Sequence, residues 1–459
     1  MSKPSSPTLP PGFGLPTAPE TAALAAALAS PPPVSIRQNP HKQPLASTLA
    51  LAEPIPWCPG GYYLVQRPSF TLDPAHHAGA YYVQEASSML VAEAVRQLLP
   101  AHCPPLLALD LCAAPGGKTT LLAEALPPGS ELIANEPISK RALILRENVL
   151  RWGAGGGAGP LRGHIRVCRH RPEELAQQLG EAFDLILVDA PCSGEGLWRR
   201  QPEAMDEWSP AAVQACALRQ QDILAQAWRL LKPGGWLLYS TCTYSTQENT
   251  ENLAWLLAQH PQARSCPLQL PEAWGFVPLP GPAQPLGWQA YPHRVRGEGF
   301  YLAAVQKGQD PPTPTEWASP EKKKKTLPTG LPGWIRLAEG YEAQLQGHSL
   351  YADYPSALPP CRLHWLLRDL PLASRKGGDW VPTHELAMHP HYMHQPPQVE
   401  LSREQALAYL RGRDPQPDCP KGWQLATYHQ LPLGWLKQLG TRCNNYLPRQ
   451  LHIRMEQAE

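Results

Sequence analysis

Two cysteines and one aspartate stand where they could act together on a substrate. Asp189 and Cys192 follow an apolar run in FDLILVDAPCSGEG, and Cys242 follows another in GGWLLYSTCTYS. Neighbouring parallel strands end at one edge of a sheet, where open α/β folds place their sites. The pattern therefore predicts two thiols and a carboxylate in one cleft.

These groups suit the methylation of carbon 5 of a cytosine. That carbon is a weak nucleophile until a thiolate adds at carbon 6. A carboxyl group bound to N3 and the exocyclic amine favours the addition, and a second thiol can assist release of the product. The residues alone leave open whether Cys192 or Cys242 attacks. The other nine of the 11 cysteines are expected to pack as small hydrophobes.

A second motif, LALDLCAAPGGKTTLLAEAL, predicts a strand, a glycine turn and a helix. Gly116 and Gly117 allow the backbone to approach a ligand at the helix N-terminus. A phosphate-binding P-loop needs glycine where Cys112 stands, and the dinucleotide pattern G-x-G-x-x-G is absent. A site for S-adenosylmethionine remains, with Lys118 facing its carboxylate. Glu136, at the end of the strand ELIANE, is placed to bind the ribose.

The surrounding sequence predicts how these motifs are positioned. Apolar runs alternate with helical patterns, which indicates a parallel sheet covered on both faces. We expect strands in LLALDL, ELIAN, IRVC, FDLILVDA, GWLLYST and GEGFYLAAVQK, and helices over residues 20–29, 118–126, 140–152, 210–231 and 247–259. The predicted fold class is α/β, with a Rossmann-like catalytic domain over residues 106–307. A small N-terminal α+β region (1–105), a linker rich in Pro, Thr and Lys (308–332) and a C-terminal α+β domain (333–459) complete the expected organisation.

Composition limits the possible classes of protein. A chain of 459 residues with 43% hydrophobic residues can bury two or three cores. Its net charge of +1 means that any nucleic-acid contact must come from local patches. Neither a signal peptide nor a membrane-spanning run is present, so we expect a cytoplasmic protein with reduced thiols, and a monomer. The histidines at 389, 391 and 394 lack partners at ligand spacing, so we expect them on the surface and predict no metal.

The chain resembles the RNA cytosine-5 methyltransferases of the NOL/NOP/SUN family, most closely the bacterial members that act on small-subunit ribosomal RNA. The resemblance covers residues 34–307, in the family's order. It rests on the segments VSIRQNPHK, AYYVQEASSML, DLCAAPGGKT, NEPISKRALILRENVLRWG, VDAPCSGEGLWRR and LLKPGGWLLYSTCTYSTQENTENL.

The resemblance implies roles for individual residues. Cys242 would be the nucleophile, Cys192 would help to release the product, and Asp189 would hold the cytosine and border the cofactor. DNA cytosine methyltransferases use the thiol of a Pro-Cys segment and would reverse the two cysteines. The segment VCRHRPEEL lacks the acid that many members carry near the adenine, so no adenine contact is assigned. The remaining cofactor contacts would be Cys112, Ala113, Ala114, Pro115, Gly116, Gly117, Lys118, Glu136 and Arg141.

The resemblance also predicts where RNA binds. The implied contacts are Arg37, Asn39 and Lys42. Arg199 and Arg200, which follow the Asp189 motif, are expected from their position to meet phosphates. The C-terminal region resembles PUA-like RNA-binding modules. Between residues 421 and 454 it has five Lys or Arg and no acid, interleaved with Trp423, Tyr428, Trp435 and Tyr446. The expected partner is ribosomal RNA or the small ribosomal subunit.

Two other functions remain open from the residues alone. One is an S-adenosylmethionine enzyme that modifies an amine or a protein side chain, which would not need Cys242. The other is a ribosome assembly factor that keeps the fold without catalysis, against which the intact Asp189, Cys192 and Cys242 argue.

Overall fold

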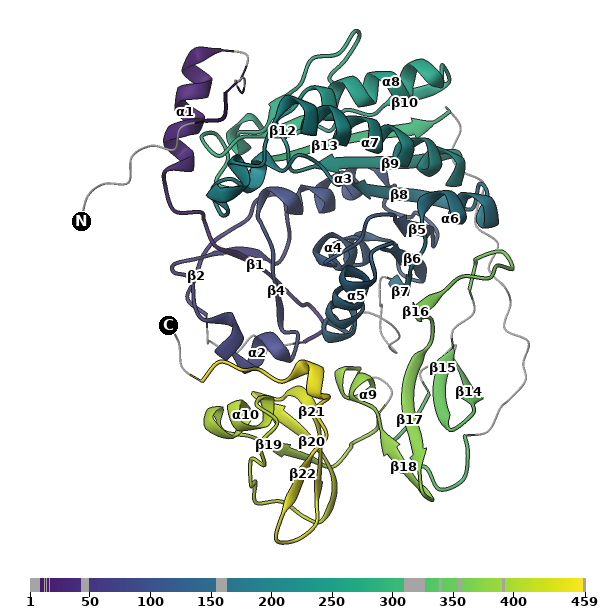
Figure 1. The fold of residues 1–459 in the computed structure, drawn as a ribbon. Coiled ribbons are helices and arrows are strands. Elements are labelled where there is room, and N and C mark those ends of the chain that lie inside the picture. The colour runs from purple at the N-terminus through teal and green to yellow at the C-terminus, as the bar shows by residue number, and fades with distance from the viewer. Residues whose placement is uncertain are drawn as a thin grey trace, which may run out of the picture.

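The computed structural model describes residues 9–11, 13, 15, 17–42, 49–153, 163–308, 327–337, 341–353, 356–389 and 393–456. A large mixed sheet with helices on both faces forms the centre (Figure 1). One smaller sheet precedes it in the chain and two follow it. Most of the predicted linker, residues 309–326, lies outside the described residues.

The central sheet contains the predicted strands. Its order is β11-β12-β13-β9-β8-β5-β6-β7-β16, with β10 also paired to β13. The parallel strands are β5 (Leu107–Asp110), β6 (Ser130–Asn135), β7 (Gly163–Cys168), β8 (Phe183–Asp189) and β9 (Leu231–Thr241). The antiparallel additions are β10 (Ala263–Ser265), β11 (Val277–Pro278), β12 (Trp288–Ala290), β13 (Phe300–Lys307) and β16 (Trp365–Leu367).

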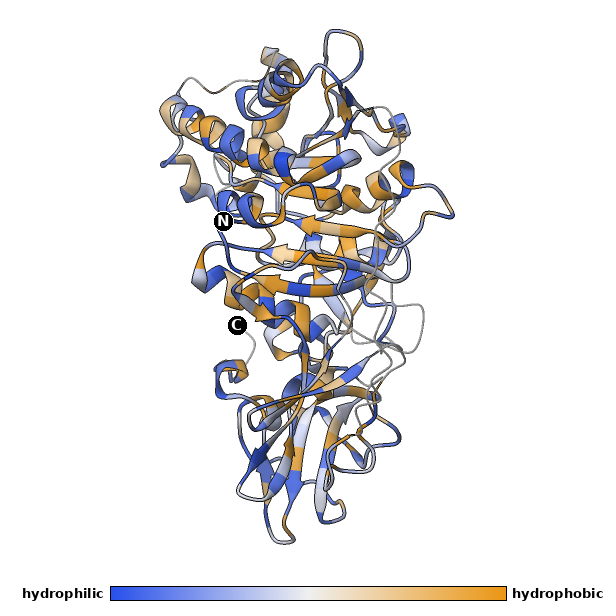
Figure 2. Ribbon diagram, turned by 90° about the vertical axis from the view of Figure 1, so that its right-hand side faces the viewer, coloured by the Kyte–Doolittle hydropathy of each residue, from blue (hydrophilic) through white to orange (hydrophobic). Residues whose placement is uncertain are grey.

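Two apolar cores lie on the two faces of this sheet. Leu107 and Leu109 of β5 belong to one core, whereas Ala108, between them, belongs to the other. This alternation explains the continuous apolar runs, because both faces of each strand are buried. Figure 2 shows these strands mostly in the hydrophobic colour. The helices on one face are α3 (Leu90–Leu98), α4 (Gly117–Ala125) and α5 (Ser139–Trp152); those on the other are α6 (Pro172–Leu179), α7 (Pro210–Leu230) and α8 (Asn252–Gln259).

The expected helices are confirmed, with one difference. Helix α7 begins where predicted, since Ser209 accepts a hydrogen bond from the Ala212 amide and Pro210 occupies the first turn. The expected helix over residues 247–259 instead opens with a π-helical turn, Gln247–Glu251, and continues as α8. Such turns occur often at functional sites, and this one directly follows the Cys242 loop.

The N-terminal region packs against the catalytic sheet. Its sheet has the order β2-β3-β1-β4, formed by Leu51–Pro54, Gly61–Leu64, Ser35–Gln38 and Tyr81–Val83. The preceding helix α1 (Ala18–Leu28) buries Leu24 and Leu28 against Trp198, Tyr244 and Tyr291. A short helix, α2 (Pro74–His77), faces the C-terminal part of the chain (Figure 1).

The C-terminal region, expected as one domain over residues 333–459, contains two separate sheets. One consists of β14 (Glu342–Gln346), β15 (Ser349–Asp353), β17 (Leu370–Lys376) and β18 (Asp379–Pro382), followed by α9 (His384–Met388). The other consists of β19 (Gln398–Glu400), β20 (Gly422–Tyr428), β21 (Leu431–Gln438) and β22 (Cys443–Asn445), with α10 (Arg403–Leu410). Strand β16 belongs to neither, because it pairs with β7 and extends the catalytic sheet.

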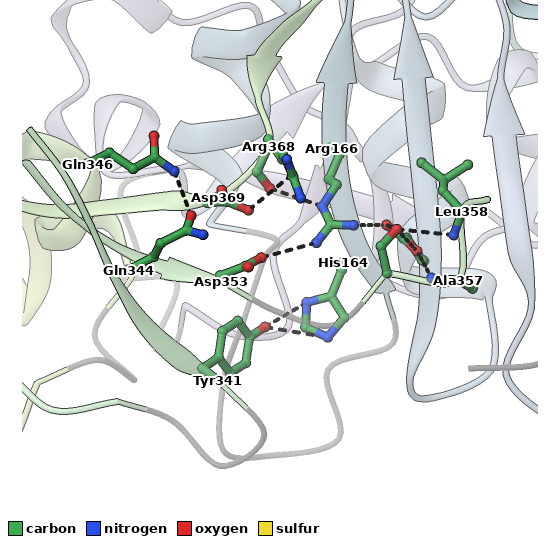
Figure 3. Close-up of polar contacts among 12 residues, drawn as sticks. His164, Arg166, Tyr341, Gln344, Gln346, Asp353, Ala357, Leu358, Arg368 and Asp369 are labelled. Carbon is green, nitrogen blue, oxygen red and sulfur yellow. Dashed lines mark hydrogen bonds and ion pairs between the residues drawn. The ribbon is translucent and has the colours of Figure 1, made fainter. Parts of the chain in front are cut away.

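A buried ion pair between two strands of the catalytic sheet also contacts the first C-terminal sheet (Figure 3). Arg166 on β7 pairs with Glu131 on β6, donates from Nε to the Arg368 carbonyl at 3.1 Å, and lies 3.8 Å from Asp353 on β15. Glu131 also accepts from Ser356 Oγ at 2.7 Å. Unpaired charges are costly to bury, so these contacts hold the C-terminal segment in place.

Candidate active site

The two predicted thiols are in contact. Strands β8 and β9 are parallel neighbours, with Asp189 opposite Ser240, so the loops that follow them meet. Cys192 Sγ lies 3.2 Å from Cys242 Sγ. The hydrogen bond with the Cys242 thiol, together with burial, raises the pKa of Cys192 well above its usual range. The shift favours the thiol form of Cys192, which can donate its S–H to the Cys242 sulfur, although the geometry of the contact allows either sulfur to be the donor.

The predicted carboxylate lies at the same edge of the sheet. Asp189 Oδ1 accepts from Ser240 Oγ at 2.8 Å, and Asp189 Oδ2 accepts from Lys118 Nζ at 2.9 Å. Burial works against the charge of Lys118, but Asp189 outweighs it and raises the pKa of the lysine above its ordinary value. Lys118 thus pairs with a protein carboxylate, whereas the sequence led us to expect a cofactor carboxylate opposite it.

Two buried glutamates connect the thiol loops. Glu248, in the π-helical turn, accepts from the Ser193 amide at 3.1 Å and from Gln220 Nε2 at 2.7 Å. Thr243, next to Cys242, bonds to Glu195 and lies 3.4 Å from Glu248. Burial raises the pKa of Glu248. The network fixes the residues that follow both cysteines. It could not be predicted from the sequence, because an isolated glutamate in a helical pattern usually faces solvent.

The predicted cofactor loop borders a hollow beside the thiols. Gly116 has a φ of +110°, which favours glycine, and a side chain on Gly117 would approach Tyr82 to 3.2 Å. Asp189 and Lys118 share the hollow with the loop. The complete lining is Tyr82, Val83, Gln84, Glu85, Ser88, Asp110, Cys112, Ala113, Ala114, Pro115, Gly117, Lys118 and Asp189.

Glu136 and Arg141 lie next to this loop. Glu136 is 2% exposed and accepts from the Ile138 amide at 3.0 Å. Arg141 bridges the two elements, since its Nη2 lies 3.5 Å from Glu136 Oε2 and donates to the Ala114 carbonyl at 3.0 Å. The structure brings both residues to the loop, and their contact with a ribose stays a prediction.

Two buried polar atoms of the hollow fit the amino-acid end of S-adenosylmethionine. Asp110 Oδ1 and Gln84 Nε2 have no hydrogen-bond partner among the described residues. One can accept from an ammonium group and the other can donate to a carboxylate, the two groups that this end carries. Asp110 was not among the predicted site residues, although its place at the end of LALD, just before the glycine turn, is a signal that the sequence contains.

The Asp110 carboxyl gives a prediction about stability and pH. Burial raises its pKa from 3.8 to about 7, so the folded state loses stability as pH rises between these values. The side chain of Asp110→Asn is always neutral. We expect this variant to be as stable as the wild type at pH 4, and its free energy of unfolding to be about 2–4 kcal/mol higher than that of the wild type at pH 8. Urea denaturation at both pH values checks this, and a variant less stable than the wild type at pH 8 would contradict it.

The same substitution should weaken cofactor binding, because it removes a charged acceptor from the hollow. We expect the affinity for S-adenosylmethionine to fall about 10- to 100-fold. Calorimetric titration measures this directly. Unchanged affinity would remove Asp110 from the set of cofactor ligands.

The structure corrects the predicted RNA contacts near the N-terminus. Arg37, Asn39 and Lys42 are 2%, 1% and 5% exposed. Arg37 donates to Gln84 Oε1 at 3.1 Å and stacks 4.2 Å from the centre of the Trp152 ring. Asn39 and Lys42 donate to backbone carbonyls of the catalytic domain, at 2.6 Å in each case. These side chains attach the N-terminal sheet to the catalytic domain and cannot reach RNA.

The two other arginines differ from each other. Arg199 is mostly buried and donates to the carbonyls of Ser30 and Gly297, each at 3.1 Å. Its guanidinium is used within the protein, which argues against the predicted RNA contact. Arg200 is exposed and lies 3.5 Å from Glu298, so it stays a candidate.

The C-terminal aromatic residues also differ in how exposed their side chains are. Trp435 and Tyr428 are 1% and 6% exposed and belong to cores. Trp423 and Tyr446 are half-buried and pack edge to face at 4.5 Å, with Lys437 above the Trp423 ring. Only this second pair keeps the predicted accessibility to RNA.

The predicted surface position is wrong for one of the three histidines. His389 is 2% exposed and bonds through Nδ1 to the Glu385 carbonyl at 2.8 Å. His394 is exposed, and His391 lies outside the described residues. In the described part of the chain, no three His, Cys, Asp or Glu side chains are grouped to hold a metal ion. None of the described helices has the length and apolar character to cross a membrane.

Three family models match the chain. The model for the 16S rRNA methyltransferase RsmB/F matches residues 103–306, the one for the N-terminal domain of 16S rRNA methyltransferase RsmF matches 15–86, and the one for the methyltransferase RsmF PUA domain matches 396–453. The last match coincides with the sheet that starts at β19 and excludes the β14–β18 sheet.

Curated relatives match over nearly their whole length. Ribosomal RNA small subunit methyltransferase F of Aliivibrio fischeri strain MJ11 is 32% identical over 87% of this chain and 85% of its own. The protein of that name from Serratia proteamaculans is 33% identical over 91% and 90%.

Solved structures resemble about two thirds of the chain. A methyltransferase homolog protein from Pyrococcus horikoshii is 27% identical, with a TM-score of 0.51, over 63% of this chain and 90% of its own. NSun6 from the same organism, determined with SFG, is 21% identical over 64% and 95% with a TM-score of 0.51, and shares the fold. The predicted family and the Rossmann-like methyltransferase fold are thus confirmed, and the chain belongs to the RsmB/F family of 16S rRNA methyltransferases.

Proposed function

We propose that this protein transfers a methyl group from S-adenosylmethionine to carbon 5 of a cytosine in small-subunit ribosomal RNA. Membership of the RsmB/F family supports the substrate and the cofactor. The observation that carries the chemistry is the contact between Cys192 and Cys242, at 3.2 Å, beside Asp189. Methyl transfer to an amine needs no such pair of thiols.

Cys242 acts as the nucleophile in this proposal. Its thiolate forms a bond to carbon 6, and the electron pair of the 5,6 double bond makes carbon 5 nucleophilic. The S–H of Cys192 donates to the Cys242 sulfur and stabilises the thiolate before attack. S-adenosylmethionine, when bound, supplies the methyl group that carbon 5 takes.

Cys192 acts again when the product is released. The carbon-5 proton passes to water, the bond between Cys242 Sγ and carbon 6 breaks, and its electron pair returns to sulfur. A protonated Cys192 in contact with that sulfur donates a hydrogen bond to the departing thiolate. Glu248 contacts both Ser193 and Thr243, and these contacts support the approach of the two loops that carry the sulfurs.

Asp189 binds the cytosine ring, and its neighbours prepare it for that task. Its side chain is 29% exposed, so one face of the carboxylate is open to a ligand. Lys118 and Ser240 fix its orientation, which lowers the cost of aligning it with the exocyclic amine of cytosine. Residues 112–118, Glu136 and Arg141 hold the cofactor in this proposal, with Asp110 and Gln84 at its amino-acid end.

The test is made on ribosomal RNA from cells that lack the protein. Bisulfite sequencing of the small-subunit RNA should show a cytosine that loses its protection in these cells and regains it when the wild-type protein is supplied. A purified protein that binds this RNA but transfers no labelled methyl group, to naked RNA or to subunits, would favour an assembly factor instead. The enzyme is proposed to act as a monomer in the cytoplasm.

A further inference from the structure

A wide cleft separates the segment before β1 from the loop before β13. It has a volume of about 1070 Å³ and is lined by residues 31–35, 64–67, 83–84, 199–200 and 292–296. Val83 and Gln84 also line the hollow beside the cofactor loop. The cleft and the hollow therefore adjoin each other at the end of β4.

Five arginines line this cleft, and none of its lining residues is acidic. Arg199 is occupied by backbone carbonyls and its side chain is 9% exposed. The other four are exposed, namely Arg67, Arg200, Arg294 and Arg296. In a chain whose net charge is only +1, this is a marked local concentration of positive charge.

The four exposed guanidinium groups differ in their partners. Arg200 lies 3.5 Å from the buried Glu298, and 40% of its own side chain stays exposed. Arg67 stacks 5.4 Å from the centre of the Phe70 ring, and no described carboxylate lies within ion-pair distance of it. Arg294 and Arg296 pair with Glu20 and Glu53, which do not line the cleft. Exposed ion pairs of this kind contribute about 0–1 kcal/mol, so a phosphate can replace them.

Apolar surface lies between the arginines. Pro31, Pro32 and Pro33 form part of one wall, and Val65 is 70% exposed. Pro292 and His293 also line the cleft, in the loop that carries Arg294. Single-stranded nucleic acids bind where positive side chains follow the backbone and flat apolar groups receive unstacked bases.

We propose that this cleft binds the single-stranded RNA next to the target cytosine, with backbone phosphates on Arg67, Arg200, Arg294 and Arg296. The inference rests on the proposed function, which makes RNA the substrate. Double-stranded RNA would present its bases stacked and paired, and would leave the apolar wall unused. The bound strand brings the cytosine, swung out of its stack, to the two thiols.

Salt-dependent binding tests this assignment. The cleft variant is Arg67→Gln/Arg200→Gln/Arg294→Gln, and its matched control is Arg219→Gln/Arg229→Gln/Arg362→Gln, which removes three exposed arginines outside the cleft. The ligand is a single-stranded RNA of about 12 nucleotides, a length within the range that such sites cover. We expect the slope of log affinity against log salt to fall by about 2 in the cleft variant and to stay unchanged in the control.

Activity separates this inference from the proposed function. The cleft variant should raise KM for RNA about 10- to 100-fold, with a much smaller change in kcat. Equal salt slopes for the cleft and control variants, with an active wild type, would overturn the cleft assignment alone. Polyglutamate that binds as tightly as RNA would overturn it in favour of an acidic protein partner. A wild type that methylates no RNA would overturn the proposed function.

Discussion

Replacing Cys242 with alanine should lower methyl transfer to RNA by about three orders of magnitude or more, because no other group in the site can add to carbon 6. Cys192 stays buried in this variant, and burial raises its pKa, which disfavours the thiolate that it would need to attack in place of Cys242. Binding of the cofactor and RNA should change less than about threefold, since the substitution removes one sulfur from a preformed loop. Incorporation of labelled methyl groups into ribosomal RNA measures the loss.

Cys361→Ala is the matched control, since it removes a half-buried thiol outside the two catalytic loops. It should retain activity within about twofold. A Cys242→Ala enzyme with most of its activity would point to an amine or a protein side chain as the methyl acceptor, and would remove covalent catalysis from the mechanism.

Replacing Cys192 with alanine should trap the enzyme on its RNA. Attack by Cys242 survives, but the sulfur that leaves carbon 6 loses the thiol donor that contacts it at 3.2 Å. A missing hydrogen bond to a charged group costs about 1.5–3 kcal/mol, which slows the release step about 10- to 100-fold. A band that contains protein and RNA should therefore accumulate on denaturing gels.

The double variant separates the two sulfurs. Cys192→Ala/Cys242→Ala should give no such band, and neither should Cys242→Ala alone. An adduct in Cys242→Ala and none in Cys192→Ala would exchange the roles of the two residues, as in the DNA enzymes with a Pro-Cys nucleophile.

The catalytic sheet and the contact between the two thiols could both be predicted from the sequence. Both follow from local signals, because a strand buried on both faces is apolar throughout, and its last residues show where the loop begins. Asp189 and Cys242 are each the end of such a run, so parallel pairing of β8 and β9 brings them together without further information.

The sequence did not reveal which polar side chains are buried by partners that lie far away in the chain. Arg37 looked like a surface residue, but it bonds to Thr120, and Asn39 bonds to the Trp152 carbonyl, 113 residues away. Arginine and lysine are rarely buried unless they are paired, and a single sequence does not show the pairs. Strand β16 was missed for a similar reason, since its three residues have no periodicity and are strand only because β7 lies beside them.

The pairing of β16 with β7 makes the methyltransferase unit depend on residues far beyond its last strand. If the chain were cut after β13, β7 would become an open edge with unpaired amide and carbonyl groups, the kind of edge along which proteins aggregate. Arg166 and Glu131 would also lose their contacts with Arg368 and Ser356. We therefore expect a shortened enzyme to aggregate although its catalytic residues are all present. The C-terminal region is thus part of the catalytic fold as well as an appended module.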